Sequence, residues 1–293
     1  MRVLIAGCGY AGLPLGAELV RQGHEVFGLR RSATEPLRAA GITPLAGDIT
    51  QPQSLAHLPR NFDWVVNCAA SSGGTAEDYR RLYLDGNRNL LAWLADAPPQ
   101  KFVYTSSTSV YAQNDGSWVT EQSPAEPEAA TARVLVEAEN VLRAAARRHF
   151  PAVILRVAGI YGPGRGHLFQ QFLRGEARIE GEGARFLNMI HRDDLVRVIT
   201  AALAGGVPGE IYHAADNEPV TQLAFFEWLA AQLKQPLPPK VAADTEAGRK
   251  RGVTNKRVSN AKLRAELDCR LQYPDFRAGY AAEILRIITK MED

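Results

Sequence analysis

The sequence predicts an α/β protein built on a doubly wound parallel sheet, with a smaller carboxyl-terminal lobe. Two observations carry this prediction. A short apolar run, a glycine-rich turn and a helical pattern open the chain, and strand and helix patterns then alternate through its first half. Each helix in such an alternation returns the chain across the sheet, so that consecutive strands lie parallel. Ligands of these sheets bind at the carboxyl ends of the strands, and functional residues are expected there.

The first strand and helix predict a nucleotide site. Residues 2–6 (RVLIA) are apolar and short, as in a buried strand, and residues 13–21 have helical spacing. Between them, Gly7, Gly9 and Gly12 form a G-x-G-x-x-G motif. Its glycines permit a tight turn, close approach of the backbone to a pyrophosphate and close packing of helix on strand. The helix amino terminus adds N–H groups and a positive dipole end. We interpret this as the Rossmann-type entry for a dinucleotide; an ordinary tight turn is the alternative.

The end of the second strand predicts which dinucleotide binds. Residues 25–29 form this strand, and a site for NAD places Asp or Glu after it to hold the ribose 2′-hydroxyl. Here Arg30, Arg31 and Ser32 follow instead. Two guanidinium groups and a hydroxyl suit a 2′-phosphate, which a carboxylate would repel. The sequence therefore favours NADP as the cofactor, with NAD as the second choice. A pair of solvated surface arginines is the other interpretation.

Size and composition indicate a soluble globular protein. The chain has 293 residues, of which 46% are hydrophobic and 23% charged, and its net charge of +2 gives no reason to expect a nucleic-acid partner. Its three cysteines include no C-x-x-C pair, so neither a disulfide framework nor a metal site is indicated. The sequence shows no leader peptide and no apolar run long enough to span a membrane. We therefore expect a cytoplasmic protein without a membrane partner.

One basic run stands in the second half of the chain. It contains Arg249, Lys250, Arg251, Lys256 and Arg257. Such a run is usually a solvated loop. In a lobe that binds a substrate, however, the same charges could meet a phosphate group.

The remaining elements follow from apolar runs and helical spacing. Three further core strands are predicted at 62–68, 101–106 and 152–157, and two long helices at 76–95 and 128–150. The second half is less regular, and its predicted helices and returning strand are 168–173, 189–204, 209–215, 221–233, 259–267 and 275–288. We assign a dinucleotide-binding domain and a substrate-binding lobe. The domain comprises residues 1–161 and 187–217, and the lobe comprises 162–186 and 218–293.

Five segments together resemble the extended short-chain dehydrogenase/reductase family, which includes the nucleotide-sugar epimerases and dehydratases. They are 47–49 (GDI), 67–70 (NCAA), 101–111 (KFVYTSSTSVY), 155–163 (LRVAGIYGP) and 190–195 (IHRDDL). The resemblance runs from end to end of the chain, and it is much more specific for the fold than for the reaction. It implies that Asp48 holds the adenine and that 67–70 lie along the cofactor. The cofactor-binding residues expected from motif and resemblance are Gly7, Gly9, Tyr10, Ala11, Gly12, Arg30, Arg31, Ser32, Asp48, Ile49, Cys68, Ala69, Ala70, Thr105, Arg133, Val157 and Ile160.

The resemblance also implies a catalytic set. Ser107 stands at the family's catalytic Ser/Thr position and could hydrogen-bond a carbonyl, although a hydroxyl that only satisfies the strand end is an equal alternative. Tyr111 and Tyr161 are the candidate proton donors, each with a structural role as the competing interpretation. Arg133 completes the set, as the residue at the lysine position described next.

The sequence departs from the family at the catalytic helix. A Tyr-x-x-x-Lys pair is expected there, with the lysine four residues before a helical glutamate. Counting back from Glu137 places Arg133 at the lysine position and Ala129 at the tyrosine position. Alanine cannot transfer a proton, and arginine keeps only the charge of the lysine. Two smaller departures are Gly159, where relatives commonly have asparagine, and Arg185, two residues upstream of an expected diphosphate-binding arginine.

Two functions follow from these observations. The first is an NADP(H)-binding oxidoreductase or epimerase-like protein that acts by hydride transfer on a small carbonyl, a carbinol or a nucleotide sugar, without the usual Tyr-x-x-x-Lys pair. The alternative is a non-catalytic NADP-binding sensor or scaffold protein. The partner expected in the first case is a small-molecule substrate, and a homodimer stays open.

Overall fold

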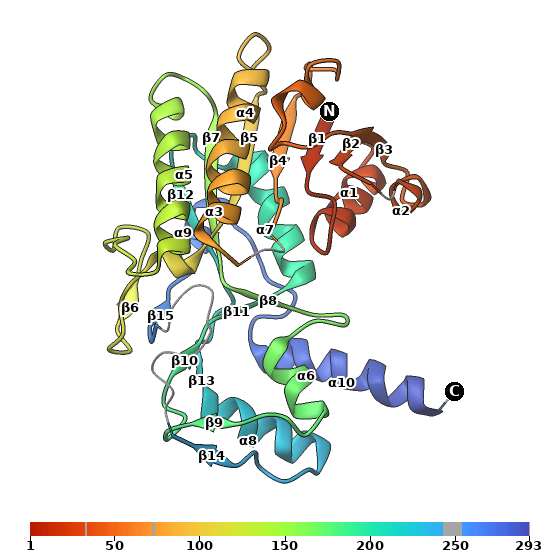
Figure 1. Ribbon diagram of the computed structural model, residues 1–293. Coiled ribbons are helices and arrows are strands. Elements are labelled where there is room, and N and C mark those ends of the chain that lie inside the picture. The colour runs from red at the N-terminus through yellow and green to blue at the C-terminus, as the bar shows by residue number, and fades with distance from the viewer. Residues whose placement is uncertain (33, 72–73, 243–253, 293) are drawn as a thin grey trace.

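The central element of the computed structural model is a seven-stranded sheet in which every paired strand runs parallel (Figure 1). The structure describes residues 1–32, 34–71, 74–242 and 254–292. The order of the strands reverses between β1 and β4, which is where ligands of doubly wound sheets bind. The predicted fold class is therefore confirmed. Across the sheet the strands are β12 (Ile211–Ala214), β7 (Ala152–Val157), β5 (Lys101–Ser107), β4 (Trp64–Asn67), β1 (Arg2–Ala6), β2 (Glu25–Arg30) and β3 (Thr43–Ala46).

Helices cover both faces of the sheet because its strands are apolar on both sides. Leu90, Leu135 and Leu142 belong to one hydrophobic cluster, and Leu15 and Leu195 belong to a second cluster across the sheet. The first face carries α3 (Ala76–Tyr79), α4 (Gly86–Trp93) and α5 (Ala130–Ala146), and the second carries α1 (Gly12–Arg21), α2 (Glu35–Ala39), α7 (Arg192–Gly205) and α9 (Ala261–Leu267).

Three local differences separate the sequence predictions from the structure. The predicted helix over 76–95 is interrupted by a π-helical segment at Arg80–Asp85. The predicted helix over 189–204 begins with a strand, β11 (Met189–His191), which pairs with β8 (Gly159–Tyr161). Strand β3 was not predicted, because it is four residues long, contains a proline and is only partly buried at the sheet edge.

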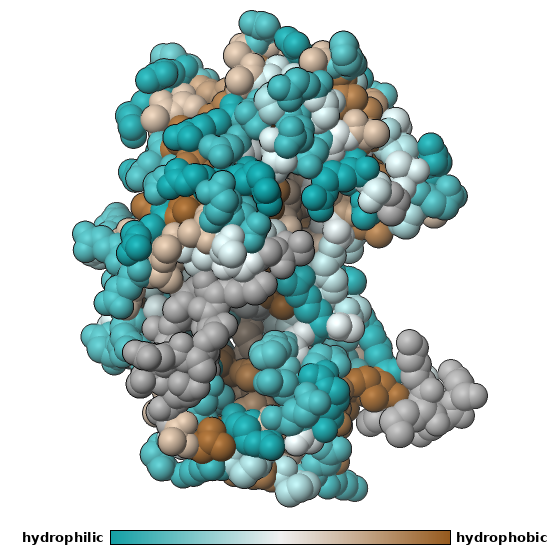
Figure 2. All heavy atoms as spheres, in the orientation of Figure 1, coloured by the Kyte–Doolittle hydropathy of each residue, from teal (hydrophilic) through white to brown (hydrophobic). Residues whose placement is uncertain are grey.

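The smaller lobe has its own core beneath the carboxyl ends of the strands (Figure 1). Aromatic side chains dominate this core, and Phe225 packs against Phe226, Phe276 and Tyr280. The space-filling view shows a waist between the lobe and the domain (Figure 2). The elements of the lobe are α6 (His167–Leu173), β9 (Ile179–Glu180), β10 (Phe186–Leu187), β13 (Val220–Thr221), α8 (Gln222–Leu233), β14 (Lys240–Val241) and α10 (Phe276–Glu292).

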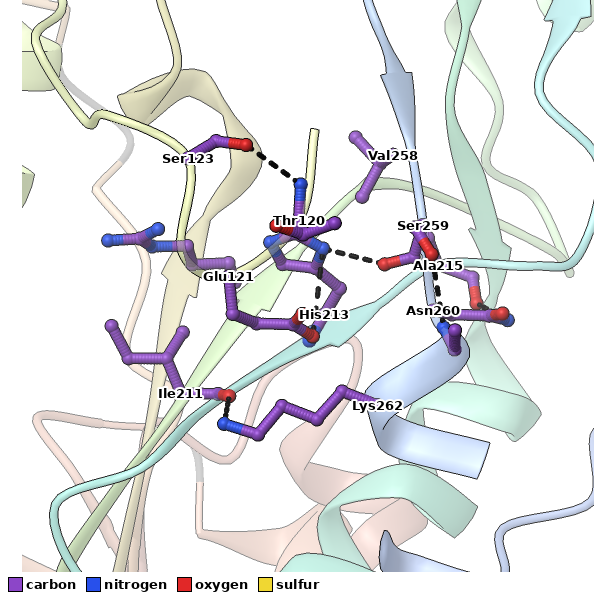
Figure 3. A network of polar contacts seen from close by, with 12 residues as sticks. Thr120, Glu121, Ser123, Ile211, His213, Ala215, Val258, Ser259, Asn260 and Lys262 are labelled. Atoms are coloured by element: carbon purple, nitrogen blue, oxygen red, sulfur yellow. Dashed lines mark hydrogen bonds and ion pairs between the residues drawn. The ribbon is translucent and has the colours of Figure 1, made fainter. Parts of the chain in front are cut away.

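One segment lies on the other side of the predicted domain boundary. Residues 257–269 were assigned to the lobe, but Leu263 and Cys269 are buried in a cluster of the central sheet. A polar network fixes this segment to β12: Ser259 O contacts His213 Nδ1 at 2.7 Å, and Lys262 Nζ donates to the carbonyl of Ile211 at 2.9 Å (Figure 3). Residues from near the end of the chain therefore pack in the dinucleotide-binding domain. In the same segment, the short strand β15 (Arg257–Val258) pairs with β6 (Trp118–Val119).

Candidate functional site

The glycine turn after β1 has the shape that a dinucleotide requires. Gly7 has a φ of +94°, and a Cβ there would lie 2.4 Å from the backbone nitrogen of Ala69. A Cβ at Gly9, by contrast, would meet nothing within 4 Å, so this glycine faces open space. Helix α1 begins next, and no side chain caps its amino terminus. The turn can therefore receive a pyrophosphate against bare backbone.

A groove of about 750 Å³ extends from this turn across the ends of the neighbouring strands. Most of the predicted cofactor-binding residues line it. Gly12 lies behind the turn, where a Cβ would be 2.4 Å from the carbonyl oxygen of Gly7, and it supports the packing of α1 instead. The predicted residues that line the groove are Gly7, Gly9, Tyr10, Ala11, Arg30, Arg31, Ser32, Asp48, Ile49, Cys68, Ala69, Ala70 and Ile160.

A second cavity, of about 560 Å³, shares the Cys68–Ala70 wall and Ile160 with the groove. Two further predicted cofactor-binding residues, Thr105 and Val157, line this inner cavity, as does Ser107. Ser107 also lines a third cavity, of about 350 Å³, which reaches into the smaller lobe. Its hydroxyl accepts a hydrogen bond from the backbone N–H of Ser109 at 3.2 Å. Ser107 thus lies between the inner cavity, which adjoins the groove, and the third cavity, which is bounded by the lobe.

Tyr111 is held within the protein rather than at the site. Its hydroxyl lies 2.6 Å from both Arg156 Nη1 and His213 Nε2, and 2.9 Å from the carbonyl of Thr120. Because the carbonyl of Ser259 can only accept, Nδ1 of His213 carries a hydrogen. The unprotonated Nε2 and the carbonyl of Thr120 are then the two acceptors for the one hydrogen of the Tyr111 hydroxyl. Burial raises the pKa of Tyr111 to about 12. Its side chain is fully buried and lines none of the three cavities, so Tyr111 cannot donate a proton to a substrate there.

His213 gives this network a pH dependence. Burial is the main cause that lowers its pKa to about 4, and the charges of Arg156 and Lys262 act in the same direction. Between pH 6.5 and 4 the unfolded chain therefore binds a proton at His213 that the folded protein does not bind. The contribution of His213 to stability is complete above pH 6.5 and is lost as the pH falls from 6.5 to 4. We expect a loss of about 3 kcal/mol in the free energy of unfolding.

Chemical unfolding at several pH values measures this effect. The free energy of unfolding of the unaltered protein should fall more steeply from pH 7 to pH 4 than that of His213→Gln. The buried Glu121, whose Oε1 accepts the backbone N–H of His213, is present in both proteins and does not account for a difference. Parallel curves for the two proteins would contradict the assignment.

Tyr161 does reach a cavity. It lines the third cavity, where its ring stacks on Tyr280 with centroids 4.2 Å apart. Its hydroxyl donates to the carbonyl of Asp275 at 3.5 Å, and burial raises its pKa. The ring is therefore part of the wall, while a raised pKa makes the phenol a weaker proton donor.

The structure does not bring Arg133 to the site. Its side chain is exposed, and Nη1 donates to the carbonyl of Glu128 at 2.6 Å. Arg133 lines none of the three cavities. Glu137, from which the position was counted, also faces outward and pairs with Arg80 at 3.1 Å.

The buried glutamate of α5 is Glu139, two residues further along. It is 2% exposed and pairs with Arg156 of β7 at 2.6 Å. Counting four and eight residues back from Glu139 gives Leu135 and Thr131. Leu135 lines the inner cavity together with Ser107.

Three of the lining residues that the sequence did not assign to the site carry a polar or charged group of interest. Arg165 lines both the groove and the inner cavity, with its guanidinium 4.9 Å from the Tyr10 ring. Tyr83 lines the inner cavity, and its hydroxyl accepts the N–H of Ser71 at 3.1 Å. Lys256 lines the third cavity. In the sequence, the glycine-rich segment 162–166 (GPGRG) could have indicated Arg165, and the basic run could have indicated Lys256. Arg249, Lys250 and Arg251 of that run lie outside the described residues.

The three cysteines are free thiols, and burial raises the pKa of Cys8 to about 12. Cys68 Sγ donates to the carbonyl of Gly7 at 3.3 Å, which ties the end of β4 to the glycine turn. The cysteines at the groove are therefore small packing groups that let the two strand ends approach.

Among the described residues, the helices are too short or too polar to cross a bilayer.

The comparisons with known proteins agree with this geometry. A model of the NAD dependent epimerase/dehydratase family matches residues 3–215. Protein YeeZ of Escherichia coli strain K12 is 28% identical over 285 residues, which cover 94% of this chain and 97% of YeeZ. The 2-alkyl-3-oxoalkanoate reductase of Stenotrophomonas maltophilia strain K279a is 27% identical over 256 residues, covering 80% of this chain and 77% of the reductase.

A solved structure is similar over almost the whole chain. DesIV, the dTDP-glucose 4,6-dehydratase of Streptomyces venezuelae with NAD and TYD bound, is similar with a TM-score of 0.82 and 27% identity, over 96% of this chain and 95% of DesIV. The matched range contains the seven strands of the central sheet, apart from Arg2 at the start of β1, and the glycine turn. It ends before α8 and α10 of the lobe. The chain belongs to the NAD dependent epimerase/dehydratase family.

Proposed function

We propose that this protein is an NADP(H)-dependent oxidoreductase that acts on a small carbonyl or carbinol compound with Ser107 as the group that orients the substrate oxygen. The observation that carries the proposal is the position of Ser107, which lines both the inner cavity and the third cavity. The similarity to a 2-alkyl-3-oxoalkanoate reductase supports reduction over epimerisation. A nucleotide sugar as substrate, with epimerase-like chemistry, is the variant that the similarity to DesIV supports.

The residues of the groove fit a dinucleotide. The bare turn at Gly9 would hold the pyrophosphate, Asp48 and Ile49 the adenosine, and Cys68 to Ala70 the nicotinamide half. A nicotinamide bound there would supply the hydride, and a water molecule in the cavity would supply the proton of the new hydroxyl. Ser107 would hold the oxygen of the substrate by a hydrogen bond.

The proposed reaction does not use the Tyr-x-x-x-Lys acid–base pair that is usual in the family. Residues 128–150 contain neither tyrosine nor lysine, and Leu135 lines the inner cavity. A leucine can neither lower the pKa of a phenol nor hold a ribose hydroxyl. General acid catalysis typically contributes about 10²- to 10⁴-fold, so turnover should be low on ordinary ketones.

The choice of cofactor is the first test. Arg30 and Arg31 line the groove beyond β2, with Arg30 Nη1 3.3 Å from the carbonyl oxygen of Cys8. Calorimetry should find NADP(H) bound about ten- to a hundredfold more tightly than NAD(H), since a charge-assisted hydrogen bond is worth about 1.5–3 kcal/mol. Arg31→Ala should remove much of this difference, while Arg38→Ala, on the exposed side of α2, should not. Equal affinities for both cofactors in the unaltered protein would contradict the proposal.

The reaction is the second test. NADPH oxidation is measured against a panel of ketones, aldehydes and sugar nucleotides, first with the unaltered protein and then with Ser107→Ala. We expect Ser107→Ala to abolish the activity without weakening NADPH binding, and Ser123→Ala, a serine remote from the cavities, to keep it. If cofactor-loaded protein reduces nothing in the panel, the non-catalytic alternative, an NADP-binding sensor or scaffold, becomes the better account. Leu135 is the observation that favours that alternative.

A further inference from the structure

Lys256 is a buried cation at the wall of the third cavity. The residue is 4% exposed, and its Nζ donates to the carbonyl of Tyr111 at 3.3 Å and to Thr254 Oγ1 at 2.6 Å. Both acceptors are uncharged, and within the part of the chain that the structure describes no carboxylate pairs with this lysine. Burial is accordingly the cause that lowers the pKa of Lys256 to about 8. A desolvated ammonium costs free energy that two neutral acceptors offset only in part.

The position of this lysine is built into the fold. Asn188 grips its segment on both sides, because Nδ2 donates to the carbonyl of Lys256 at 2.9 Å and Oδ1 accepts the N–H of Val258 at 2.7 Å. The next residues form β15 and enter the network of Ser259 and His213 (Figure 3). Lys256 therefore does not lie in a solvated loop, as a basic run would usually indicate, but at a fixed point of the cavity wall.

The lining of the third cavity is suited to a small anion with an apolar body. Lys256 and Arg185 are the cations in its wall, and no aspartate or glutamate is among the described residues that line it. The Ser107–Ser109 turn also lines this cavity, and Nζ of Lys256 donates to the carbonyl of Tyr111 just beyond that turn. The apolar part of the lining includes Leu168, Phe186, Leu187, Met189 and Phe225.

We propose that Lys256 binds the carboxylate of the substrate, and that the substrate is a small oxo acid whose carbonyl oxygen lies at Ser107. This inference rests on the proposed function and adds the substrate class to it. Ser107 and Lys256 line one cavity of about 350 Å³, a volume that admits a short oxo acid. The ammonium of Lys256 matches the single charge of a carboxylate. The other cation of the wall, Arg185, already has a carboxylate near it, with Nε 3.8 Å from Glu180 Oε2.

Calorimetry on the purified protein, with and without saturating NADP⁺, tests the proposal. The probes are pyruvate, acetoacetate and levulinate, each compared with its primary amide, which has the same shape without the charge. We expect at least one acid to bind and its amide to bind about ten- to a hundredfold more weakly, as for a charge-assisted hydrogen bond. Lys256→Met should reduce acid binding to the level of the amide, whereas Lys256→Arg should retain part of it. Lys240→Met, which removes an exposed lysine of the lobe, should change nothing.

Two further readouts separate an anion-binding role from a structural one. At pH 8.5, acid binding by the unaltered protein should be coupled to proton uptake, visible as a dependence of the heat on the buffer, and Lys256→Met should lose this coupling. Thermal unfolding should show Lys256→Met at least as stable as the unaltered protein, because a buried ammonium is replaced by an apolar group of similar length. A clearly destabilised variant, together with equal binding of acids and amides by the unaltered protein, would assign Lys256 a structural role.

Two additional probes decide whether Lys256 binds a carboxylate or a phosphate. Inorganic phosphate or uridine diphosphate that binds through Lys256, while all the oxo acids fail, would overturn the oxo-acid assignment. NADPH binding measured on the same preparations keeps the two proposals apart. Failure of every acid with NADPH binding intact refutes only the substrate class, whereas loss of NADPH binding refutes the proposed function.

Discussion

Arg156→Leu is expected to lower the free energy of unfolding by about 3–5 kcal/mol, the range for removing one partner of a buried ion pair. The guanidinium of Arg156 makes three hydrogen bonds to the Glu139 carboxylate, of 2.6, 3.1 and 3.2 Å, and a further one to the Tyr111 hydroxyl. Both residues of the pair are less than 5% exposed. Without the arginine, a carboxylate would stay buried with only the hydroxyl of Ser106, 2.6 Å away, as its partner.

The double variant Arg156→Leu with Glu139→Leu is the matched control. Replacing both charges by apolar groups removes the uncompensated carboxylate, so much of the lost stability should return. Guanidinium unfolding of the three proteins gives the comparison. Double and single variants of equal stability would show that the pair contributes through packing alone. The consequence for the site is local, because Glu139 also holds Ser106, the neighbour of Ser107, against α5.

This pair also explains why counting back from Glu137 led to an exposed residue, Arg133. Glu137 and Glu139 are both helical glutamates, and nothing in the local pattern says which of them is buried. The choice is made by Arg156, which enters from β7 and is seventeen residues away from Glu139. Counting from the buried glutamate replaces Arg133 and Ala129 by Leu135 and Thr131. The prediction that this helix supplies no lysine or tyrosine did not depend on that register, because residues 128–150 contain neither.

Predictions that rested on local chemistry agreed with the structure, and those that needed distant contacts did not. The glycine turn and the strand ends follow from a few adjacent residues, and they line the groove as expected. Tyr111 and Lys256 could not be placed in this way. Tyr111 is held by His213, and the Lys256 segment by Asn188, contacts that span 102 and 68 residues of sequence. The local sequence around Tyr111 and Lys256, a V-Y dipeptide and a basic run, does not indicate whether distant partners such as His213 and Asn188 are present.

Gly9→Val should abolish dinucleotide binding while leaving the fold intact, and Gly7→Val should disrupt the fold itself. The two glycines are two residues apart but differ in their surroundings. A side chain at Gly9 meets open space, which is the space that a pyrophosphate would occupy, so valine should clash with the cofactor and with nothing else. We expect the affinity for NADP(H) to fall by at least about a hundredfold, since the phosphate contacts are charge-assisted.

At Gly7 both the backbone and the space are unfavourable. A φ of +94° is strained for a branched side chain, and its Cβ would lie 2.4 to 2.7 Å from the backbone of Cys68 and Ala69. Backbone strain and overpacking each cost about 1–3 kcal/mol, so Gly7→Val should lose about 2–6 kcal/mol of the free energy of unfolding. Thermal unfolding and calorimetry with NADP(H) on both variants distinguish the cases. A Gly9→Val protein that is folded and still binds the cofactor would place the phosphates elsewhere, and a Gly7→Val protein of normal stability would refute the geometry of the turn.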